Sequence, residues 1–266
     1  MSYAILRFQK RKAGGVVACE CHNERKKEAY KSNPDIDVGR SKDNYHLVKP
    51  PRYTYKKEIN QMVKEAGCKV RKDSVMMVET LITASPEFMN SLLPEEQKEY
   101  FSMALDFISE RVGKKNILSA VVHMDERTPH MHLCFVPLTP DNKLSAKSIL
   151  GNQKSLSEWQ TAYHERMSSR WNQLERGQSV VETKRKHIPT WLYKLGGRLD
   201  KQYEEIVSAL SDINAFNAGK KRDKALELIA AWLPDVEKFS KEIGKQQVYI
   251  DSLKERIGQE SDYAGR

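Results

Sequence analysis

Apolar and polar positions along the chain predict a mixture of strands and helices. Apolar-rich or alternating runs predict strands at residues 3–9, 16–21, 74–83, 117–124 and 128–138. Helical spacing and helix-boundary residues predict helices over 54–66, 94–113 and 155–171. The resulting order, β-β-α-β-α-β-β-α, contains runs of neighbouring strands. It therefore predicts an α+β domain with an antiparallel sheet and helices on one face.

Boundary residues support several of these elements. Pro94 fits a first helical turn, and Gly113 fits the C-terminal end of the same helix. The sequence Ser155-Leu156-Ser157-Glu158 resembles a capping box that opens the last helix of the domain. We expect Gly14-Gly15 to form a turn between the first two strands, and the polar, proline-bearing stretch 31–52 to be mostly loop.

The pattern changes near residue 188. We predict one domain over 1–188 and a helical region over 189–266, interrupted at Gly196-Gly197 and at 214–222. Apolar residues then recur at heptad spacing, with the polar Gln246 in one position; they are Val236, Phe239, Ile243, Ile250, Leu253 and Ile257. This short seam predicts docking within the chain or a homodimer through the C-terminal helices.

Charge and composition narrow the class of protein. The net charge is +9, and residues 1–72 alone contain 18 Lys and Arg against 8 Asp and Glu. A basic excess confined to one segment is typical of a surface that binds a polyanion such as DNA. The sequence has no apolar run of membrane-spanning length and no signal-peptide pattern, so we expect a cytoplasmic protein with no membrane span. Its four cysteines predict reduced thiols, because they form no disulfide framework.

A cluster of histidines indicates chemistry. His130 and His132 lie two residues apart in a predicted strand, so both imidazoles point to the same face. The preceding strand ends at His123, and a short turn can bring it beside this pair. Three neutral imidazoles can bind a divalent metal ion and leave coordination positions open, as catalysis requires. We therefore predict a metal site at His123, His130 and His132.

Residues near this cluster suggest how it could act. A carboxylate in the turn, Glu126 or Asp125, can orient a ligand histidine or accept a proton, and we favour a functional role for Glu126. A metal beside a basic surface favours phosphate chemistry, which also needs a nucleophile. Four side chains are candidates for that nucleophile: His22, Tyr30, Tyr45 and Tyr53.

Taken together, these motifs resemble a known family. His123–His132 has the form HxDExTPHxH, which resembles the third motif of the HUH relaxases. With the early segment HNER at 22–25 and NYHL at 44–47, it is similar to the MobV (Pre/Mob) relaxases, which are plasmid mobilisation and recombination enzymes. The opening MSYAILRFQKRKAG and the stretch VRKDSV at 70–75 add to the resemblance, which covers about residues 1–185.

The resemblance implies an HUH relaxase fold, with a central antiparallel sheet flanked by helices and a C-terminal helical extension. It implies binding of origin-of-transfer DNA, as a single strand or a hairpin, and a divalent ion, manganese ahead of Mg²⁺ or Zn²⁺. Cleavage would leave a covalent 5′-phosphate on His22, with Glu126 accepting the proton and Asp125 in support. Tyr45 is the alternative nucleophile, and four residues would contact DNA: Arg25, Asn44, Arg71 and Lys72.

Three other functions stay open at this point. An HUH endonuclease for rolling-circle replication or transposition would share the metal site but use tyrosine. A non-catalytic DNA-binding protein could hold a structural metal with the same histidines. A hydrolase of small phosphates fits less well, because the basic excess indicates a polymeric substrate.

Overall fold

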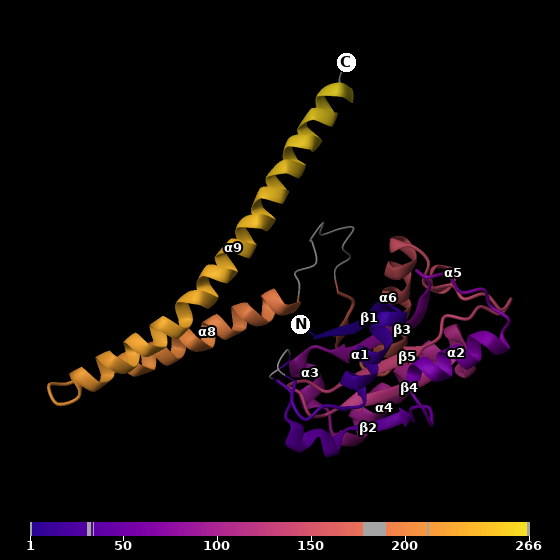
Figure 1. Cartoon of the computed structure of the whole chain (residues 1–266), viewed down its shortest axis with the longest axis horizontal. Helices are drawn as coiled ribbons and strands as arrows, with labels where there is room; N and C mark the ends of the chain where they lie inside the picture. Colours follow the sequence, from indigo (N-terminus) through magenta and orange to yellow (C-terminus); the bar gives the residue numbers. More distant parts are fainter. Residues whose placement is uncertain (1, 31–32, 34, 178–189, 212, 265–266) are drawn as a thin grey trace. The chain divides into compact units, whose positions relative to one another are not determined.

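The computed structural model describes residues 2–30, 33, 35–177, 190–211 and 213–264. The chain divides into two compact units, residues 1–183 and 184–266. Figure 1 shows a sheet with its helices in the first unit, and two helices in the second.

The first unit contains a six-stranded sheet in the order β2-β4-β5-β3-β1-β6. The strands are β1 (Ser2–Lys12), β2 (Tyr45–Val48), β3 (Val75–Ala84), β4 (Ile117–His123), β5 (His130–Phe135) and β6 (Leu174–Glu175). All pairings are antiparallel except the short β1–β6 pairing, which is parallel. The predicted α+β class is confirmed, with a mixed sheet in which the β4–β5 hairpin lies inside and not at an edge.

One face of the sheet packs against α4 (Pro94–Val112) and α6 (Gln153–Ser168). Alternate strand residues supply this core, including Met131, Leu133 and Phe135 of β5. The predicted apolar stripe of α4 is buried there, and Gly113 ends the helix with φ of 85°. Two short helices, α3 (Pro86–Ser91) and α5 (Ala146–Leu150), complete this part of the unit.

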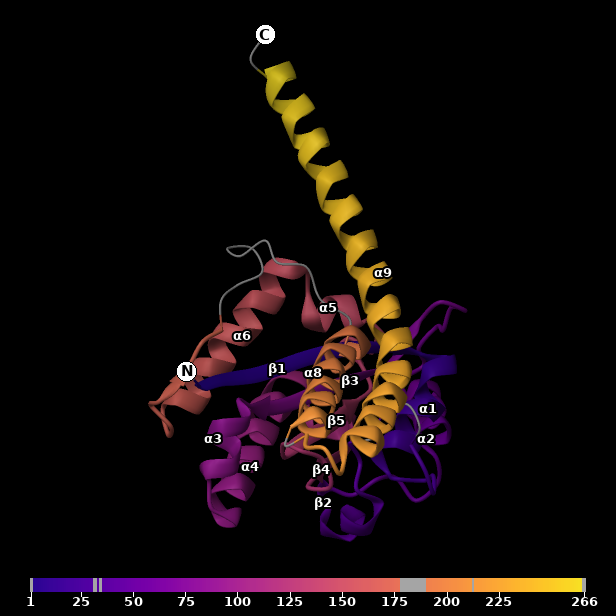
Figure 2. The ribbon, with the colours of Figure 1, turned by 90° about the vertical axis from the view of Figure 1, so that its left-hand side faces the viewer.

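The opposite face of the sheet has a smaller core beneath α1 (Ala13–Asn23) and α2 (Tyr55–Glu65). Cys134 and Val136, which follow the histidine pair, point into it. The prediction of helices on one face was therefore wrong. Both faces are covered because β3, β4 and β5 carry apolar residues on each side, so each side needs a packing partner. Figure 2 shows the same elements from a second direction.

The largest error of the sequence prediction concerns residues 13–23. The predicted turn at Gly14-Gly15 and strand over 16–21 are instead the continuous helix α1. Its buried residues, Val16, Cys19, Glu20 and Asn23, follow the i, i+3, i+4, i+7 spacing of a helix. That spacing was present in the sequence, but the β-branched Val16-Val17 pair and the two glycines outweighed it.

Two smaller corrections concern element boundaries. Within the predicted loop 31–52, the structure has a 3-10 helix, η1 (Val38–Asp43), and the strand β2, which pairs with β4. The helix expected to start at the capping box begins earlier, because Asn152 is its N-cap and accepts from the backbone N–H of Ser155.

The second unit is a pair of helices, α8 (Thr190–Leu210) and α9 (Ala218–Ala264). The predicted break at Gly196-Gly197 is absent from α8. Gly196 instead lies against Phe239, where a methyl group would be 3.6 Å from the ring, so the glycine permits close packing of the two helices. The side chains of the later seam residues Gln246, Ile250, Leu253 and Ile257 lie outside the described part. No described helix is both long and apolar enough to cross a membrane.

The larger core predicts a clear difference between two substitutions. Phe101→Ala removes a fully buried ring and should lower the free energy of unfolding by about 3–5 kcal/mol. Leu93→Ala, at a 64% exposed position, should change it by less than about 0.5 kcal/mol. Urea denaturation followed by circular dichroism measures both, and equal effects would contradict the assigned core.

Candidate metal centre

Three imidazoles meet at the turn end of the β4–β5 hairpin. His123 pairs with His130 across the two strands, and His132 follows on the same face of β5. Ring centroids are 5.3 Å apart for His123 and His130, 4.8 Å for His123 and His132, and 5.0 Å for His130 and His132. The structure thus brings together the three histidines predicted as metal ligands.

Each of these rings has one nitrogen fixed by an oxygen that can only accept a hydrogen bond. His123 Nε2 lies 2.9 Å from the carbonyl of Asn23, and His130 Nδ1 lies 2.9 Å from the carbonyl of Thr128. His132 Nδ1 lies 2.9 Å from a carboxylate oxygen of Glu79. The ring nitrogen facing each acceptor must carry the proton, so the opposite nitrogen carries a lone pair.

The nitrogens left with lone pairs suit a cation. Two of them, His123 Nδ1 and His132 Nε2, are buried with no hydrogen-bond partner. Leaving a buried polar atom unpaired costs about 1–3 kcal/mol, so a pair of them in one small volume is unusual in a folded protein. A divalent ion would satisfy both. These residues therefore fit a resident metal by their chemistry as well as by their spacing.

Burial keeps His123 and His130 neutral. It lowers the pKa of His130 to about 4 and holds the pKa of His123 further below its usual range, and the neighbouring His132 adds to both shifts. Neutral imidazole is the form that binds metal, so the site is prepared for a cation at neutral pH.

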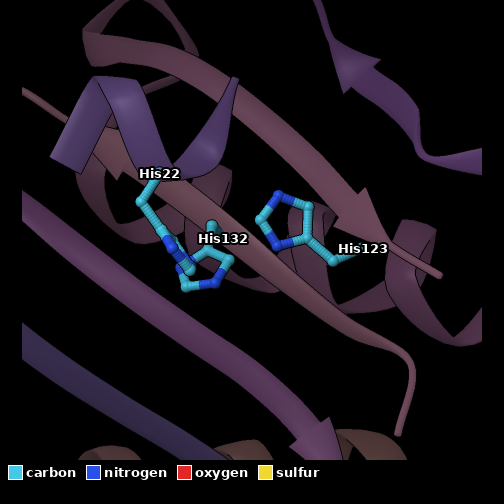
Figure 3. A group of neighbouring side chains, drawn as sticks. All are labelled: His22, His123 and His132. Atoms are coloured by element: carbon cyan, nitrogen blue, oxygen red, sulfur yellow. The ribbon is translucent and has the colours of Figure 1, made fainter. Parts of the chain in front are cut away.

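His22 joins the cluster from the last turn of α1. Its ring centroid lies 5.5 Å from that of His123 and 5.1 Å from that of His132, and Figure 3 shows the three rings gathered together. Burial first, and then the nearby His132, lowers the pKa of His22 to about 4. The ring is therefore neutral at physiological pH, and its Nδ1 lies 3.5 Å from Arg25 Nη1, which can only donate. It can serve either as a nucleophile or as a further ligand, since His22, His123 and His132 form one possible metal-binding group.

Arg25 ties the end of α1 to the turn between β4 and β5. Its guanidinium donates to both oxygens of Asp125, at 2.8 and 2.7 Å, and to Glu126 Oε1 at 2.8 Å. A third branch donates to the carbonyl of His22 at 3.0 Å. The Arg25 side chain is only 9% exposed. This geometry indicates that Arg25 positions the two segments, and its contact with DNA stays a prediction.

Glu126 points toward the free imidazole nitrogens. Its Oε1 lies 3.7 Å from His130 Nε2 and 3.9 Å from His123 Nδ1, and these three side chains form a second possible metal-binding group. Its other oxygen accepts from Asn33 at 2.9 Å. Asp125 is fully buried, bound to Arg25 and to the Ser41 hydroxyl, so it supports the turn and does not contact a ligand histidine in the way the sequence suggested.

Sequence analysis missed Glu79, the partner of His132. Its second oxygen accepts two hydrogen bonds from Arg11, at 3.0 and 2.5 Å. Burial raises the pKa of the Glu79 carboxyl, but the hydrogen bonds from His132 and Arg11 outweigh it and hold the pKa well below its usual range. A signal was available, because a lone carboxylate inside the apolar run SVMMVETLIT requires a buried partner.

The alternative nucleophile Tyr45 lies on the other face of the sheet. It pairs with Val122 and packs against the core beneath α4, and burial raises the pKa of its hydroxyl to about 12. Tyr53 is 56% exposed near Lys57. Tyr30 lies near His22, with ring centroids 6.2 Å apart, but its hydroxyl donates to the carbonyl of Cys21. Among the four candidates, His22 is the one whose reactive atoms face the metal centre.

The remaining residues predicted to bind DNA lie apart from the histidines or have another contact. Asn44 accepts the backbone N–H of Met124 at 2.7 Å and so fixes the end of β4. Arg71 and Lys72 are exposed in the loop before β3. That loop joins β3 six residues before Leu81, and Leu81 is the strand partner of His132. Six residues of extended strand span about 20 Å, so the loop lies that far along the strand from the histidines.

Known proteins are similar to this chain in sequence. The family model Mob_Pre, described as plasmid recombination enzyme, matches residues 1–195. A plasmid recombination enzyme of Bacillus thuringiensis is 38% identical over 205 residues, which are 77% of this chain and 45% of the relative. A type 1 plasmid recombination enzyme of Staphylococcus aureus is 36% identical over 206 residues, or 76% and 51%. The chain spans about half the length of the curated relatives it matches.

Solved structures share the fold as well. The MobM relaxase domain, bound to oriT DNA of plasmid pMV158 and to manganese, aligns with a TM-score of 0.65 and 36% identity over 70% of this chain and 95% of that one. A further manganese-bound complex of that domain with oriT DNA gives 0.65 and 34%, over 74% and 98%. The similar domain has the same architecture and is bound to manganese, and this chain has a cluster of histidines and Glu126 that could hold a metal ion.

Glu79 provides a test of how the ligands are held. Glu79→Gln removes the charge that fixes the proton on His132 Nδ1, and it should weaken Mn²⁺ binding about tenfold or more. Isothermal titration calorimetry measures this affinity. The exposed Glu87→Gln is the matched control and should bind Mn²⁺ like the unmodified chain. Equal affinities for the two variants would contradict the assigned role.

The lowered histidine pKa values predict a pH dependence of stability in the presence of a chelator. Unfolded histidine titrates near 6.5, whereas folded His22 and His130 titrate near 4, so between these values the unfolded chain binds more protons. The free energy of unfolding should be fully retained above pH about 6.5 and should fall as pH decreases toward about 4.

Urea denaturation at pH about 7 and about 5 measures this change. His130→Gln should reduce the pH dependence, because it removes one of the groups responsible. A free energy that is constant over this interval would contradict burial of neutral imidazoles.

Proposed function

The chain belongs to the Mob_Pre family of plasmid recombination enzymes, and from this premise we propose that it is a metal-dependent DNA relaxase. In this proposal it nicks one strand at an origin of transfer, holds the cut end covalently, and later rejoins the strand. The observation that carries the proposal is the placement of His22 beside the rings of His123 and His132, in a histidine cluster whose outer nitrogens are already fixed.

In the proposed site, His123, His130 and His132 hold a divalent ion, with Mn²⁺ first among the candidates because the similar MobM structures contain it. Glu126 places a carboxylate oxygen beside the same nitrogens. When bound, the ion polarises the scissile phosphate and offsets negative charge on its oxygens.

The nucleophile in this proposal is the neutral ring of His22. One of its ring nitrogens attacks phosphorus, a P–N bond forms, and the bond between phosphorus and the 3′-oxygen of the preceding nucleotide breaks. The 3′-oxygen leaves and takes a proton from solvent, while the imidazole passes its own proton to the Glu126 carboxylate. The product is a 5′-phosphoramidate on His22, and reversal of these steps rejoins the strand.

Arg25 supports both participants in that step. Because it contacts the His22 carbonyl and Glu126 at once, it keeps the proton acceptor near the nucleophile. Two parallel hydrogen bonds, from Arg25 to the two oxygens of Asp125, fix the plane of the guanidinium group. Arg71 and Lys72, exposed and basic, remain candidates for phosphate contacts farther along the DNA.

Two rival functions make different use of the same residues. A tyrosine-dependent HUH endonuclease would need a phenol near the metal centre, and Tyr45 faces the opposite core. A structural metal in a non-catalytic DNA-binding protein would need a closed coordination shell, and His22 would then serve as its fourth ligand.

Substitutions at His22 and Tyr45 test the proposal directly. With Mn²⁺ and a supercoiled plasmid carrying the DNA that flanks the chain's own gene, the unmodified protein should give nicked circles and a DNA–protein adduct on a denaturing gel. His22→Ala should lower adduct formation by about a thousandfold or more, because the nucleophile is lost. Tyr45→Phe should retain it.

The reverse pattern, loss with Tyr45→Phe and survival with His22→Ala, would show a tyrosine enzyme. A chelator should stop nicking while the far-ultraviolet circular dichroism of the protein is largely kept. Absence of nicking together with unfolding in the chelator would instead indicate the structural metal.

A further inference from the structure

One part of the sheet surface continues directly from the metal centre. Directly opposed residues in neighbouring strands point to the same face, and His132 is paired with Leu81 of β3, which is paired with Arg7 of β1. The adjacent pair on this face is Thr83 and Ile5. Strands are spaced about 4.8 Å apart, so Arg7 lies about 10 Å across the sheet from His132.

This surface lies outside both cores of the described chain. The packing of α1 and α2 covers the other end of this face, around Cys134 and Met77. Ile5, Leu81 and Thr83 are half-buried, and Arg7 is exposed, whereas their sequence neighbours Leu6 and Ile82 are fully buried on the opposite side. A half-open strip of apolar and cationic side chains therefore borders the metal centre.

Arg7 differs from the other arginines near the site. Arg11 is neutralised by Glu79, and Arg25 by Asp125 and Glu126. The Arg7 side chain has neither an ion pair nor a hydrogen bond to any residue of the described ranges, and it faces solvent beside the row that holds His132. An uncompensated guanidinium at this place raises the local positive potential where a phosphate must approach.

We propose that the strip formed by Ile5, Arg7, Leu81 and Thr83 binds the single-stranded DNA next to the scissile phosphate, and that Arg7 contacts a phosphate of that strand. The inference rests on the proposed relaxase function and extends it to a surface and a residue. Ile5 and Leu81 offer apolar contact for bases or sugars. The Thr83 hydroxyl donates to the carbonyl of Pro129, so its proton is already used within the protein. Proteins bind single-stranded nucleic acid by placing cationic side chains along its phosphate backbone and apolar or aromatic side chains against its bases.

A single strand fits this strip better than a duplex. The apolar contacts need base or sugar faces, which a duplex keeps stacked inside, and a strand running over the sheet leads directly into the histidine cluster. A protein segment bound to this strip would need an acidic residue to pair with Arg7. Its binding there would not explain why the strip borders the histidine cluster.

Binding of a fluorescein-labelled, mixed-sequence single-stranded oligonucleotide, measured by anisotropy with EDTA present, tests the surface apart from cleavage. Arg7→Ala should weaken binding roughly tenfold at low salt and should reduce the slope of log affinity against log salt by about 0.7. Arg7→Lys should recover much of both, because it restores the charge. The matched control is Lys115→Ala, an exposed lysine before β4, whose other end carries His123; it should bind like the unmodified chain.

The proposal would be overturned if Arg7→Ala and Lys115→Ala bound the oligonucleotide with equal affinity and salt slope. It would also be overturned if Arg7→Ala weakened a duplex of the same sequence as much as the single strand. A changed sedimentation coefficient without a change in DNA affinity would show that a second copy of the chain covers the strip, which is a third contrary result. Failure of the unmodified protein to nick plasmid DNA with Mn²⁺ would refute the relaxase function, whereas the oligonucleotide result would stand by itself.

Discussion

The hydrogen bonds on the outer side of the three imidazoles are the interaction on which the rest of the site depends. Without the carbonyls of Asn23 and Thr128 and the carboxylate of Glu79, each buried ring could rotate or exchange tautomers. With them, the opposite nitrogens carry lone pairs, and His123 belongs to two overlapping groups that could hold a metal, one with His22 and His132 and one with Glu126 and His130. Burial then makes protonation costly, so the cluster attracts a metal cation and not protons at neutral pH.

The same interactions also place the nucleophile. Asn23 is the residue after His22, so the carbonyl that fixes His123 belongs to the helix end that presents His22. Arg25 adds a second link by joining this helix end to Asp125 and Glu126. Truncating Arg25 would leave the fully buried Asp125 carboxylate without its counter-charge, a loss that typically costs about 3–5 kcal/mol. Positioning and folding are therefore coupled at this arginine.

Local sequence signals predicted most of the sheet and the histidine cluster, because a two-residue period and a short turn fix which side chains share a face. They failed where tertiary packing decides. Residues 16–21 have β-branched character but form α1, since burial of Val16, Cys19 and Asn23 against the sheet follows a helical spacing. The acceptors of the outer nitrogens are mostly backbone carbonyls, which no residue type reveals. The ion pairs of Arg25 with Asp125 and Glu126 join segments about a hundred residues apart, so the sequence around Arg25 does not reveal them.

The closeness in sequence of β4 and β5 has a consequence for the order in which the site assembles. His123, His130 and His132 lie on one hairpin, whose closure spans a short loop, whereas His22 reaches them from about a hundred residues away. Short loops close quickly and distant segments meet late, because their chain entropy is lost over a longer separation. The hairpin therefore brings the three ligand histidines together early, but the Asn23 carbonyl that fixes His123 arrives on the same helix end as His22. A nascent chain would complete its metal ligands and place its nucleophile in one late step, so the reactive centre becomes competent only as that long-range contact forms.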